Sequence, residues 1–508
     1  MMTSFKSIGQ TSRTKIEIVT PARLVFAAFC LAIAFVCCGS WLSGMYEHLR
    51  LDAQEIDGAE LNAQLKSVER KLAAGEDELQ ALVIPEGKLF ANSFYGYALI
   101  NLTQSRKSDA AFRERSRLKL EALLAKIKTM EDQQPYSVNA NIKPKGGIIL
   151  AGHTNLLRAG YVLIGGQNSQ IIEEFHRGSA SLSDAFLAGK VPFPECYPGY
   201  TWAEDAIFAL ESLRLHDVLF KSDYSKARSA WLSWMKNHLD SDSQMMVTQI
   251  DPQTGQIIDG PRGCALSWAL AFLPQIDPEF SRLQFDRFRN HWFIPFLGML
   301  GIQEWYKGKQ LPTQFPAGPV VFGLGGAASG IGIATCRANG DYVSWHLLLR
   351  SLETLGFPLW TPAGEKYYFW GHCLLADVLA LWGKTICRWD SDLKKVPAIE
   401  VSHYSKNDYD HIFLVTFLAA CLVSTVVVYA HFRRLVLLAK DETRVRPGWN
   451  RATIITFAIQ LLAVSAYLFS PAVFLIQVII FMLMVDMLEE LAIRPRIVSA
   501  ILNDKDAK

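Results

Sequence analysis

Three long apolar runs constrain this chain most, because a soluble fold rarely buries so many consecutive apolar residues. The runs cover residues 24–45, 411–431 and 452–487. About 20 apolar residues suffice for a helix to cross a bilayer, so each run predicts a transmembrane segment. The third run is too long for one ordinary span and contains Ser470 and Pro471 near its middle. It predicts either one kinked helix or a short hairpin.

Basic residues near the runs predict the orientation of the chain. The tail 1–23 carries four lysines and arginines, and the loop 432–451 carries six. Such residues concentrate on the cytoplasmic side of a membrane, which places both segments inside and residues 46–410 outside. We therefore predict a multi-pass protein of a bacterial inner membrane with its main domain in the periplasm. The sequence does not assign a side to the tail 488–508, and a cleaved signal peptide is the alternative for the first run.

Charge and residue spacing exclude several function classes. The chain has 51 basic and 49 acidic residues and no long block of one sign, unlike a nucleic-acid binder. The glycine-rich segment 323–332 follows no predicted strand, so it does not indicate a dinucleotide site. Cysteines and histidines show no close ligand spacing. We expect a small-molecule substrate, no metal, no cofactor and no nucleic acid, with a homo-oligomer as a possibility.

The segment outside the membrane is predicted to be helical throughout. Residues 46–84 are polar with scattered leucines, which favours an amphipathic stalk that acts as a spacer. Residues 85–400 show helical periodicity with short breaks, and strand-like alternation is nearly absent. We predict helices at 90–104, 108–132, 148–165, 168–188, 202–220, 224–239, 263–274, 279–297, 318–339, 341–355 and 371–386. So many sequential helices predict an all-α fold, an (α/α)6 barrel of six hairpins. An open solenoid is the alternative, but the chain lacks its repeated period.

Polar residues gather between residues 148 and 292. His153 begins a helix whose other face is apolar, which is also typical of a hydrogen-bonded core histidine. Cys196 precedes a predicted helix that carries Glu204 and Asp205 in its first turn. Acidic residues there also suit the helix dipole and can be simple caps. These residues are the first candidates for a site.

The same region resembles the linalool dehydratase/isomerase family. The matching positions are Gly152, His153, Tyr161, Cys196, Leu213, Asp217, Tyr224, Trp231, the loop 251–255, Trp268, Asp277, Pro278, Phe280 and Phe288. The resemblance extends over roughly residues 85–385. It implies an (α/α)6 barrel with a buried apolar site, arranged in a ring of subunits. The family's active-site histidine corresponds to His153, and its first cysteine corresponds to Cys196.

The chain departs from the family at other positions. The family's second cysteine falls on Asp205, and two of its tyrosines fall on Cys264 and Phe90, whereas Tyr95 matches. An aspartate and a tyrosine from the family's N-terminal segment have no counterpart here. The departures put the family's own substrate in doubt, although the residues left still include acids and bases.

Dehydration of an allylic alcohol needs two acid/base groups in a dry site. We predict His153, Cys196 and Asp205 as catalytic residues of a lyase or isomerase that acts on a small apolar or terpenoid-like alcohol. The predicted substrate-binding residues are Glu204, Trp202, Tyr200, Cys264, Phe90, Tyr95, Arg262 and His372.

Two alternatives remain open on sequence alone. One is a glycan-processing enzyme, in which carboxylates among Glu195, Glu204 and Asp205 would act beside Trp202, Tyr200 and Trp360. The other is a non-catalytic binding or assembly module on the membrane, which the missing family residues favour.

Overall fold

The chain divides into two compact units. The computed structural model describes residues 13–49, 58–82, 84–106, 108–139, 141–306, 318–389 and 406–440. One unit comprises Met1–Leu42 and Leu418–Lys508, and the other comprises Ser43–Phe417. The third apolar run, most of the basic loop and the C-terminal tail lie outside the described residues, so their predicted roles stay predictions.

Two long helices contain the first two apolar runs. These are α1 (Arg13–Glu47) and α15 (Lys406–Lys440), which together supply the described part of the first unit. Within them, Leu24–Tyr46 and Asp408–Arg433 are long and apolar enough to cross a membrane. Length and composition alone support this, and membrane insertion remains a prediction.

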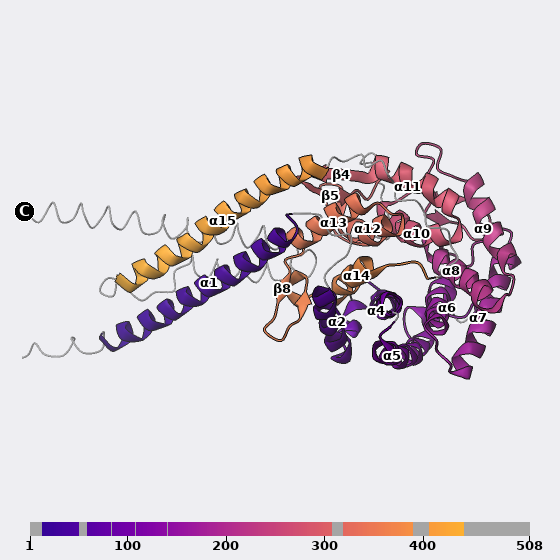
Figure 1. Cartoon of the computed structure of the whole chain (residues 1–508), viewed down its shortest axis with the longest axis horizontal. Coiled ribbons are helices and arrows are strands. Elements are labelled where there is room, and N and C mark those ends of the chain that lie inside the picture. Colours follow the sequence, from indigo (N-terminus) through magenta and orange to yellow (C-terminus); the bar gives the residue numbers. More distant parts are fainter. Residues whose placement is uncertain are drawn as a thin grey trace, which may run out of the picture. The chain divides into compact units, whose positions relative to one another are not determined.

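Six helices of the second unit form a closed ring in the described part of the chain. They are α4 (Gly87–Ser105), α6 (Gly147–Leu163), α8 (Ala203–Phe220), α10 (Gly263–Ile276), α12 (Gly326–Ala338) and α14 (Leu374–Thr385). Each packs on the next, and α14 packs back on α4 (Figure 1). These inner helices are rich in buried apolar residues, as α10 illustrates with eleven of its fourteen residues buried. The predicted all-α class is confirmed.

A second layer of helices covers the ring. The outer helices are α5 (Ala110–Lys128), α7 (Ser169–Ala188), α9 (Ser225–Asn237), α11 (Pro278–Trp292) and α13 (Tyr342–Leu355). Each packs on the inner helix that precedes it. Inner and outer helices alternate along the chain, so the inner helices run in one direction and begin at the same end of the ring. We call this end the N-terminal end of the ring.

The expected stalk is part of the ring domain instead. Helix α2 (Gly58–Ala73) packs on α14, and the short α3 (Asp77–Gln80) packs on α4. Leu65 and Val68 are buried, and Lys71 donates a hydrogen bond of 2.6 Å to the buried Asp377. The sequence suggested a spacer because Gln64, Ser67 and Lys71 made this face look polar, yet all three are buried.

Local signals explain where the outer helices begin. The side chains of Asp109, Asn168, Asp277 and Asp341 accept hydrogen bonds from backbone N–H groups in the first turns of α5, α7, α11 and α13. The six inner helices have no such side-chain cap. Their first turns instead meet the loops at the N-terminal end of the ring.

Short strands occupy several of these loops. Strands β1 (Thr201–Trp202), β2 (Gln249–Ile250) and β3 (Ile257–Asp259) form an antiparallel sheet. The hairpins are β4 (Phe293–Phe296) with β5 (Met299–Ile302), β6 (Val320–Val321) with β7 (Leu324–Gly325), and β8 (Leu359–Trp360) with β9 (Lys366–Tyr367). The predicted helices 279–297 and 318–339 were therefore too long at one end. Pro295 and Gly318, Gly323 and Gly325 disfavour helix there.

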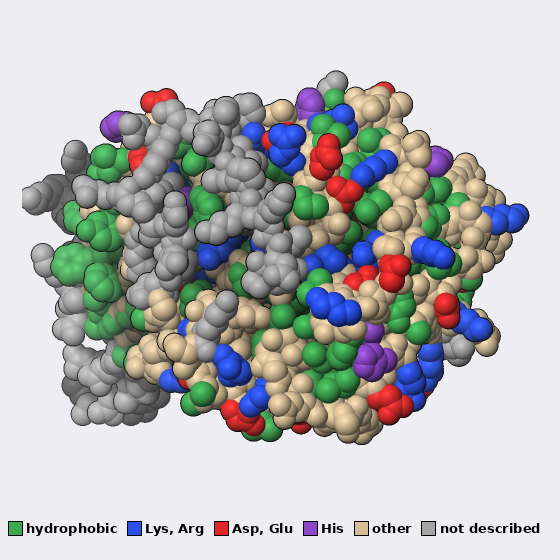
Figure 2. Space-filling model, turned by 45° about the vertical axis from the view of Figure 1, so that its right-hand side comes forward, with side chains coloured by type: hydrophobic (Ala, Val, Ile, Leu, Met, Phe, Trp, Pro, Cys, Tyr) green, Lys and Arg blue, Asp and Glu red, His purple; other side chains and the backbone are tan. Residues whose placement is uncertain are grey.

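Hydrogen bonds join the loops that precede different inner helices. The N–H of Ile148 donates to the carbonyl of Glu195 at 2.9 Å, and the N–H of Gly263 donates to the carbonyl of Glu304 at 2.8 Å. The N–H of Leu375 donates to Gln80 Oε1 at 3.3 Å. These bonds hold the loops at one end of the ring. On the face drawn in Figure 2, acidic and basic side chains are interspersed with hydrophobic ones.

Candidate functional site

Five carboxyl groups gather at the N-terminal end of the ring, and we call them the carboxyl cluster. Glu86 directly precedes α4, and Glu204 and Asp205 lie in the first turn of α8. Asp259 ends β3, and Glu304 follows β5. Segments far apart in the sequence thus supply acidic groups to one end of the fold.

Asp205 lies among groups that come from the α4 and α8 loops. Its carboxyl group shares a hydrogen bond with the Cys196 thiol, and it interacts electrostatically with Glu86. The Tyr197 hydroxyl donates to Glu86 Oε1 at 2.5 Å. The buried Tyr136 interacts electrostatically with Glu86 and Asp205, and its hydroxyl has no hydrogen-bond partner among the residues that the structure describes. The predicted pair Cys196 and Asp205 is therefore brought together.

Glu204 faces groups that come from the α10 and α12 loops. It interacts electrostatically with Arg262 and Asp259, and its Oε2 atom is buried with no hydrogen-bond partner in the described part of the chain. Arg262 Nε donates to Glu304 Oε1 at 3.0 Å. The N–H of Cys264 donates to Glu304 Oε2 at 3.2 Å. Arg262 thus neutralises Glu304, and Glu204 is left as the less well compensated acid.

Burial raises the pKa values of these carboxyl groups. It raises the pKa of Asp205 to about 7, with the Cys196 hydrogen bond acting in the opposite direction and the charge of Glu86 adding to the rise. Burial and the neighbouring Asp205 raise the pKa of Glu204 well above its usual value. Burial also raises the pKa of Glu304 to about 7, against the lowering influence of Arg262. Protonated and ionised carboxyl groups therefore coexist near neutral pH, as acid/base catalysis requires.

The thiols at this end stay protonated. Burial and nearby carboxylates raise the pKa values of Cys196 and Cys264 well above the usual value. A thiolate nucleophile needs the opposite shift, so the surroundings disfavour cysteine nucleophilic catalysis. Cys196 instead acts as a hydrogen-bond partner of Asp205.

Aromatic side chains border the carboxyl cluster. The rings of Tyr200 and Trp202 stack with centroids 6.0 Å apart and an interplanar angle of 11°. Phe90 and Trp268 are half-buried, and their ring centroids lie 5.9 Å apart. Flat apolar faces thus lie beside ionisable groups, an arrangement suited to a substrate with polar and apolar surfaces.

His153 lies deeper in the ring than the prediction of a catalytic role suggested. Its Nδ1 is 2.9 Å from the Tyr97 hydroxyl, and its ring stacks on Phe208 with centroids 3.8 Å apart. Burial lowers the pKa of His153 to about 3, so the imidazole is neutral at pH 7. Among the described residues, no hydrogen bond or ion pair joins it to Cys196 or Asp205. Its Nε2 atom likewise has no hydrogen-bond partner within the described ranges.

Other predicted residues lie outside the carboxyl cluster. Tyr95 is buried and donates to Glu69 Oε1 of α2 at 3.1 Å, so its hydroxyl is used in packing between helices. His372 is exposed in the loop before α14. Glu195 Oε1 accepts from the N–H of Gly199 at 2.8 Å and so shapes its own loop. Trp360 lies on the β8–β9 hairpin, with Lys366 Nζ 5.6 Å from its ring centroid.

Five members of the site were missed by sequence reasoning, and none of them belongs to a long periodic helix. They are Glu86, Tyr136, Tyr197, Asp259 and Glu304, of which Tyr136 begins a short 3-10 helix and Asp259 ends β3. One signal was present: Glu86 and Glu204 each lie at the start of a predicted inner helix, and such starts share one end of a ring. Glu304 carried no comparable signal, because its segment was not expected to form a strand.

Among the described residues, no three His, Cys, Asp or Glu side chains converge in a way that could hold a metal ion. The carboxyl cluster is instead held by Arg262, Tyr197 and Cys196, which bind carboxyl oxygens themselves.

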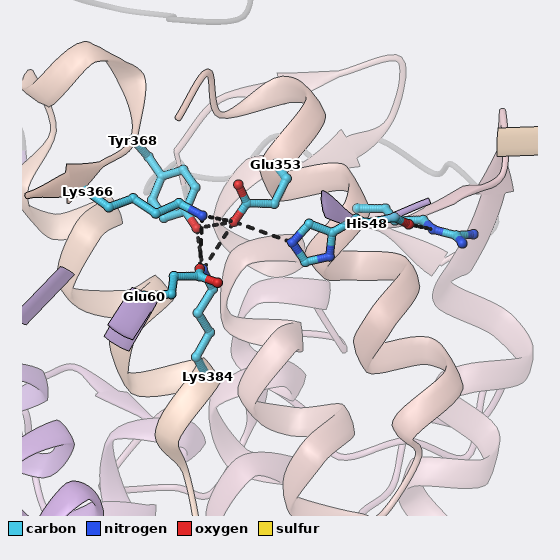
Figure 3. Close-up of polar contacts among 7 residues, drawn as sticks. His48, Glu60, Glu353, Lys366, Tyr368 and Lys384 are labelled. Atoms are coloured by element: carbon cyan, nitrogen blue, oxygen red, sulfur yellow. Dashed lines mark hydrogen bonds and ion pairs between the residues drawn. The ribbon is translucent and has the colours of Figure 1, made fainter. Parts of the chain in front are cut away.

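A second buried network, the lysine–glutamate network, consists of His48, Glu60, Glu353, Lys366, Tyr368 and Lys384. Figure 3 shows both lysine side chains reaching Glu353 and Glu60. Glu353 Oε1 lies 3.0 Å from Lys366 Nζ and 3.1 Å from Lys384 Nζ, and it also accepts from the Tyr368 hydroxyl. Glu60 Oε1 lies 2.9 Å and 2.5 Å from the same two ammonium groups. Burial lowers the pKa of His48 to about 4, so two lysines balance two glutamates.

The lysine–glutamate network joins segments that are distant in sequence. Glu60 belongs to α2, Glu353 to α13, Lys366 to β9 and Lys384 to α14. Because opposite charges are matched and buried, we assign the network to stability, as the contact that holds α2 against the last hairpin of the ring. It leaves the carboxyl cluster as the candidate functional site.

The raised pKa of Asp205 predicts a change of stability with pH. Its folded pKa of about 7 exceeds the unfolded value of about 3.9. The folded state therefore holds the proton more tightly, and stability falls as pH rises from about 4 to about 7. We expect the Tm of Asp205→Asn to fall less than the wild-type Tm between pH 5 and pH 8. Thermal melts of both proteins test this.

The control for that experiment is the exposed Asp223. Its substitution Asp223→Asn should leave the wild-type pH dependence unchanged, because the pKa of Asp223 is lowered by its hydrogen bonds to Ser225. Other carboxyl groups with raised pKa values contribute the decline that remains in Asp205→Asn: Glu304 and Asp377, whose pKa values are raised to about 7 and about 6, and Glu204 and Asp259. Equal declines in Asp205→Asn and wild type would contradict the raised pKa.

Comparisons with known proteins add a coarse likeness. No model of a known protein family matches the chain. Two solved structures resemble it, a GH76 alpha-mannanase from Bacteroides thetaiotaomicron and a GH76A alpha-1,6-mannanase from Salegentibacter sp. HEL1_6. Sequence identities are 12% and 13%, both TM-scores are 0.38, and 58% of this chain aligns with 84% and 88% of those chains. The functional argument therefore rests on the side chains described above.

Proposed function

We propose that the second unit is an (α/α)6 barrel whose N-terminal end is the active site of a glycan-processing hydrolase. The closed ring of α4, α6, α8, α10, α12 and α14, with its outer layer, supports the barrel. The observation that carries the activity is the pairing of Glu204 and Asp205, two neighbouring carboxyl groups with raised pKa values beside stacked aromatic rings.

Glycoside hydrolysis needs one protonated and one ionised carboxyl group. Of the two, Asp205 ionises first, because the Cys196 hydrogen bond favours its charged form. Glu204 keeps its proton to higher pH. In the proposed reaction, Glu204 protonates the leaving oxygen as the bond to the anomeric carbon breaks. Asp205 accepts a proton from the water that attacks this carbon.

The surrounding side chains support this division of roles. The carboxyl group of Glu86 accepts a hydrogen bond from Tyr197 and faces Asp205. Its charge adds to the rise in the pKa of Asp205, so Asp205 ionises only near neutral pH. The stacked Tyr200 and Trp202 offer ring faces against which sugar C–H groups can pack.

A substrate screen tests the proposal. The full chain, purified in lipid nanodiscs, is incubated with α- and β-linked gluco- and manno-oligosaccharides, and released reducing sugars are measured. We expect turnover with at least one of these glycans. No turnover on the panel, together with turnover of unsaturated alcohols, would overturn the hydrolase.

A lyase or isomerase of the linalool dehydratase/isomerase type is the second candidate. One observation favours it: Cys196 and Asp205, which stand at the positions of the two family cysteines, form a hydrogen bond with each other. The enclosed, neutral His153 favours it less, because it does not contact that pair. Under this reading, His153→Phe should abolish turnover of terpene alcohols, whereas the hydrolase proposal predicts that glycan turnover survives it.

We also propose that α1 and α15 anchor the protein in a membrane, with the ring outside the cytoplasm. The apolar segments Leu24–Tyr46 and Asp408–Arg433 support the anchors, and the flanking basic residues support the orientation. The test is extraction with alkaline carbonate followed by protease digestion of spheroplasts. Release of the full chain by carbonate, or a ring protected from protease, would contradict it.

A further inference from the structure

Four exposed apolar side chains lie close along the chain to residues of the site, and we call them the apolar rim. They are Val138, Tyr200, Ile258 and Phe322, with exposed fractions of 51%, 41%, 54% and 98%. Val138 follows the buried Tyr136 by two residues, and Ile258 directly precedes Asp259. Phe322 is adjacent to Gly323, whose carbonyl accepts from the N–H of Glu304 at 3.0 Å. Each rim residue thus lies within three positions of a residue of the site or, for Phe322, beside the hydrogen-bond partner of one.

Phe322 is unfavourable for stability in two ways. It occupies the first position of the two-residue turn between β6 and β7, where Phe322 and Gly323 both have positive φ, 51° and 82°. Such type I′ turns favour Asn-Gly or Asp-Gly, and a bulky residue in this conformation is strained. The ring is also almost wholly exposed to water. A costly residue beside a candidate site indicates a function for that residue.

The rim and the cluster together indicate an amphiphilic ligand. The carboxyl groups suit a hydroxyl-rich head, as do Glu204 Oε2 and the Tyr136 hydroxyl, which have no hydrogen-bond partner among the described residues. Val138 and Ile258 have no ring to stack on a sugar, so they suit an alkyl chain rather than more glycan. Resting on the proposed function, we infer that the substrate is a glycan with an alkyl or isoprenoid-like aglycone whose apolar part lies along the apolar rim.

Matched ligands test the inference by isothermal titration calorimetry. The full chain in nanodiscs is titrated with methyl and n-hexyl glycosides of glucose and of mannose. The hexyl compound has five more methylene groups than the methyl compound. If they become half buried on binding, its Kd should be lower than that of the methyl compound by about 30-fold. Burial of the alkyl chain also predicts a more negative heat-capacity change for the hexyl compound.

Phe322→Asn separates binding from folding. Asn-Gly suits the turn, so the Tm should not fall, while the hexyl preference should drop by at least about threefold. Leu297→Asn is the matched control: Leu297 is also exposed and occupies the same position of the β4–β5 turn, with φ of 50°, but its carbonyl accepts from Thr416. The control should keep the full hexyl preference.

The outcomes distinguish the inference from the hydrolase itself. Glycan turnover with equal methyl and hexyl affinity overturns the amphiphile and leaves the hydrolase. A hexyl preference without turnover overturns the hydrolase and leaves an amphiphile site. A change of oligomeric mass in Phe322→Asn, measured by light scattering, would assign the rim to a contact with another copy of the chain. A loss of vesicle binding with unchanged hexyl preference would assign it to a membrane surface. Either result overturns the inference.

Discussion

Glu353→Gln is expected to lower the free energy of unfolding of the ring domain by about 3–5 kcal/mol. Glu353 is fully buried and binds two buried ammonium groups, those of Lys366 and Lys384. Without its charge, Glu60 alone must compensate both lysines. A buried charge left without a partner costs far more than a surface pair contributes. Urea unfolding, followed by tryptophan fluorescence, measures the loss.

A double-mutant cycle controls for the loss of packing. Glu353→Met with Lys384→Met removes one charge of each sign and leaves Glu60 paired with Lys366. The double variant should therefore be more stable than the sum of the two single losses predicts. Strict additivity would show that the charges of Glu353 and Lys384 do not interact, contrary to the assigned role.

The pH dependence of this network follows from the same charges. The lysines hold the pKa of Glu353 well below its usual value despite burial, so its contribution is complete above about pH 5 and is lost only in strong acid. The glutamates raise the pKa of Lys366, so its contribution is complete below about pH 10 and is lost at higher pH. Glu353→Gln should therefore have a nearly constant effect between pH 5 and pH 10.

Glu204→Gln and Asp205→Asn are each expected to lower kcat on the glycan substrate by about 10²–10⁴-fold, the usual contribution of a general acid or base. The rate of the wild type should rise with pH through about 7 as Asp205 ionises, and fall at higher pH as Glu204 loses its proton. Initial rates across the pH range test both limbs.

The control for these substitutions is Glu279→Gln. Glu279 is also in the first turn of a helix, α11, but it is exposed and belongs to the outer layer. It should leave kcat unchanged. Full activity in Glu204→Gln would remove Glu204 from the mechanism. Loss of activity in Glu279→Gln would show that the losses are not specific to the carboxyl cluster. The Tm of each variant at pH 5 separates catalytic loss from unfolding.

The helical layout was predictable because local signals set it. Segments such as 148–165 and 168–188 match α6 and α7 within two residues, since apolar periodicity and the Asn168 cap are local. The β4–β5 and β6–β7 hairpins were not predicted, because short strands with two-residue turns leave little alternation to detect. The role of α2 was missed because its buried face carries polar residues, and the partner of one of them, Lys71, is Asp377, about 300 positions away.

The site was predictable where its residues lie beside the start of a predicted inner helix, as Arg262 and Cys264 do for α10. Cys196, Glu204 and Asp205 lie within ten positions and meet as expected. Glu86 and Glu304 reach the site only because the ring closes, and no local sequence pattern specifies this closure. His153 looked catalytic from its residue type and from the family likeness, but its enclosure by Tyr97 and Phe208 depends on tertiary packing.

The most direct test of the carboxyl cluster as a hydrolytic site is a reaction run in ¹⁸O-labelled water with the full chain and a glycan from the screen. If water attacks the anomeric carbon, mass spectrometry should detect one ¹⁸O atom at the reducing end of the product, at a level above the exchange seen without protein. Glu204→Gln should not give this labelled product. An unsaturated product without label would instead establish elimination and contradict the account.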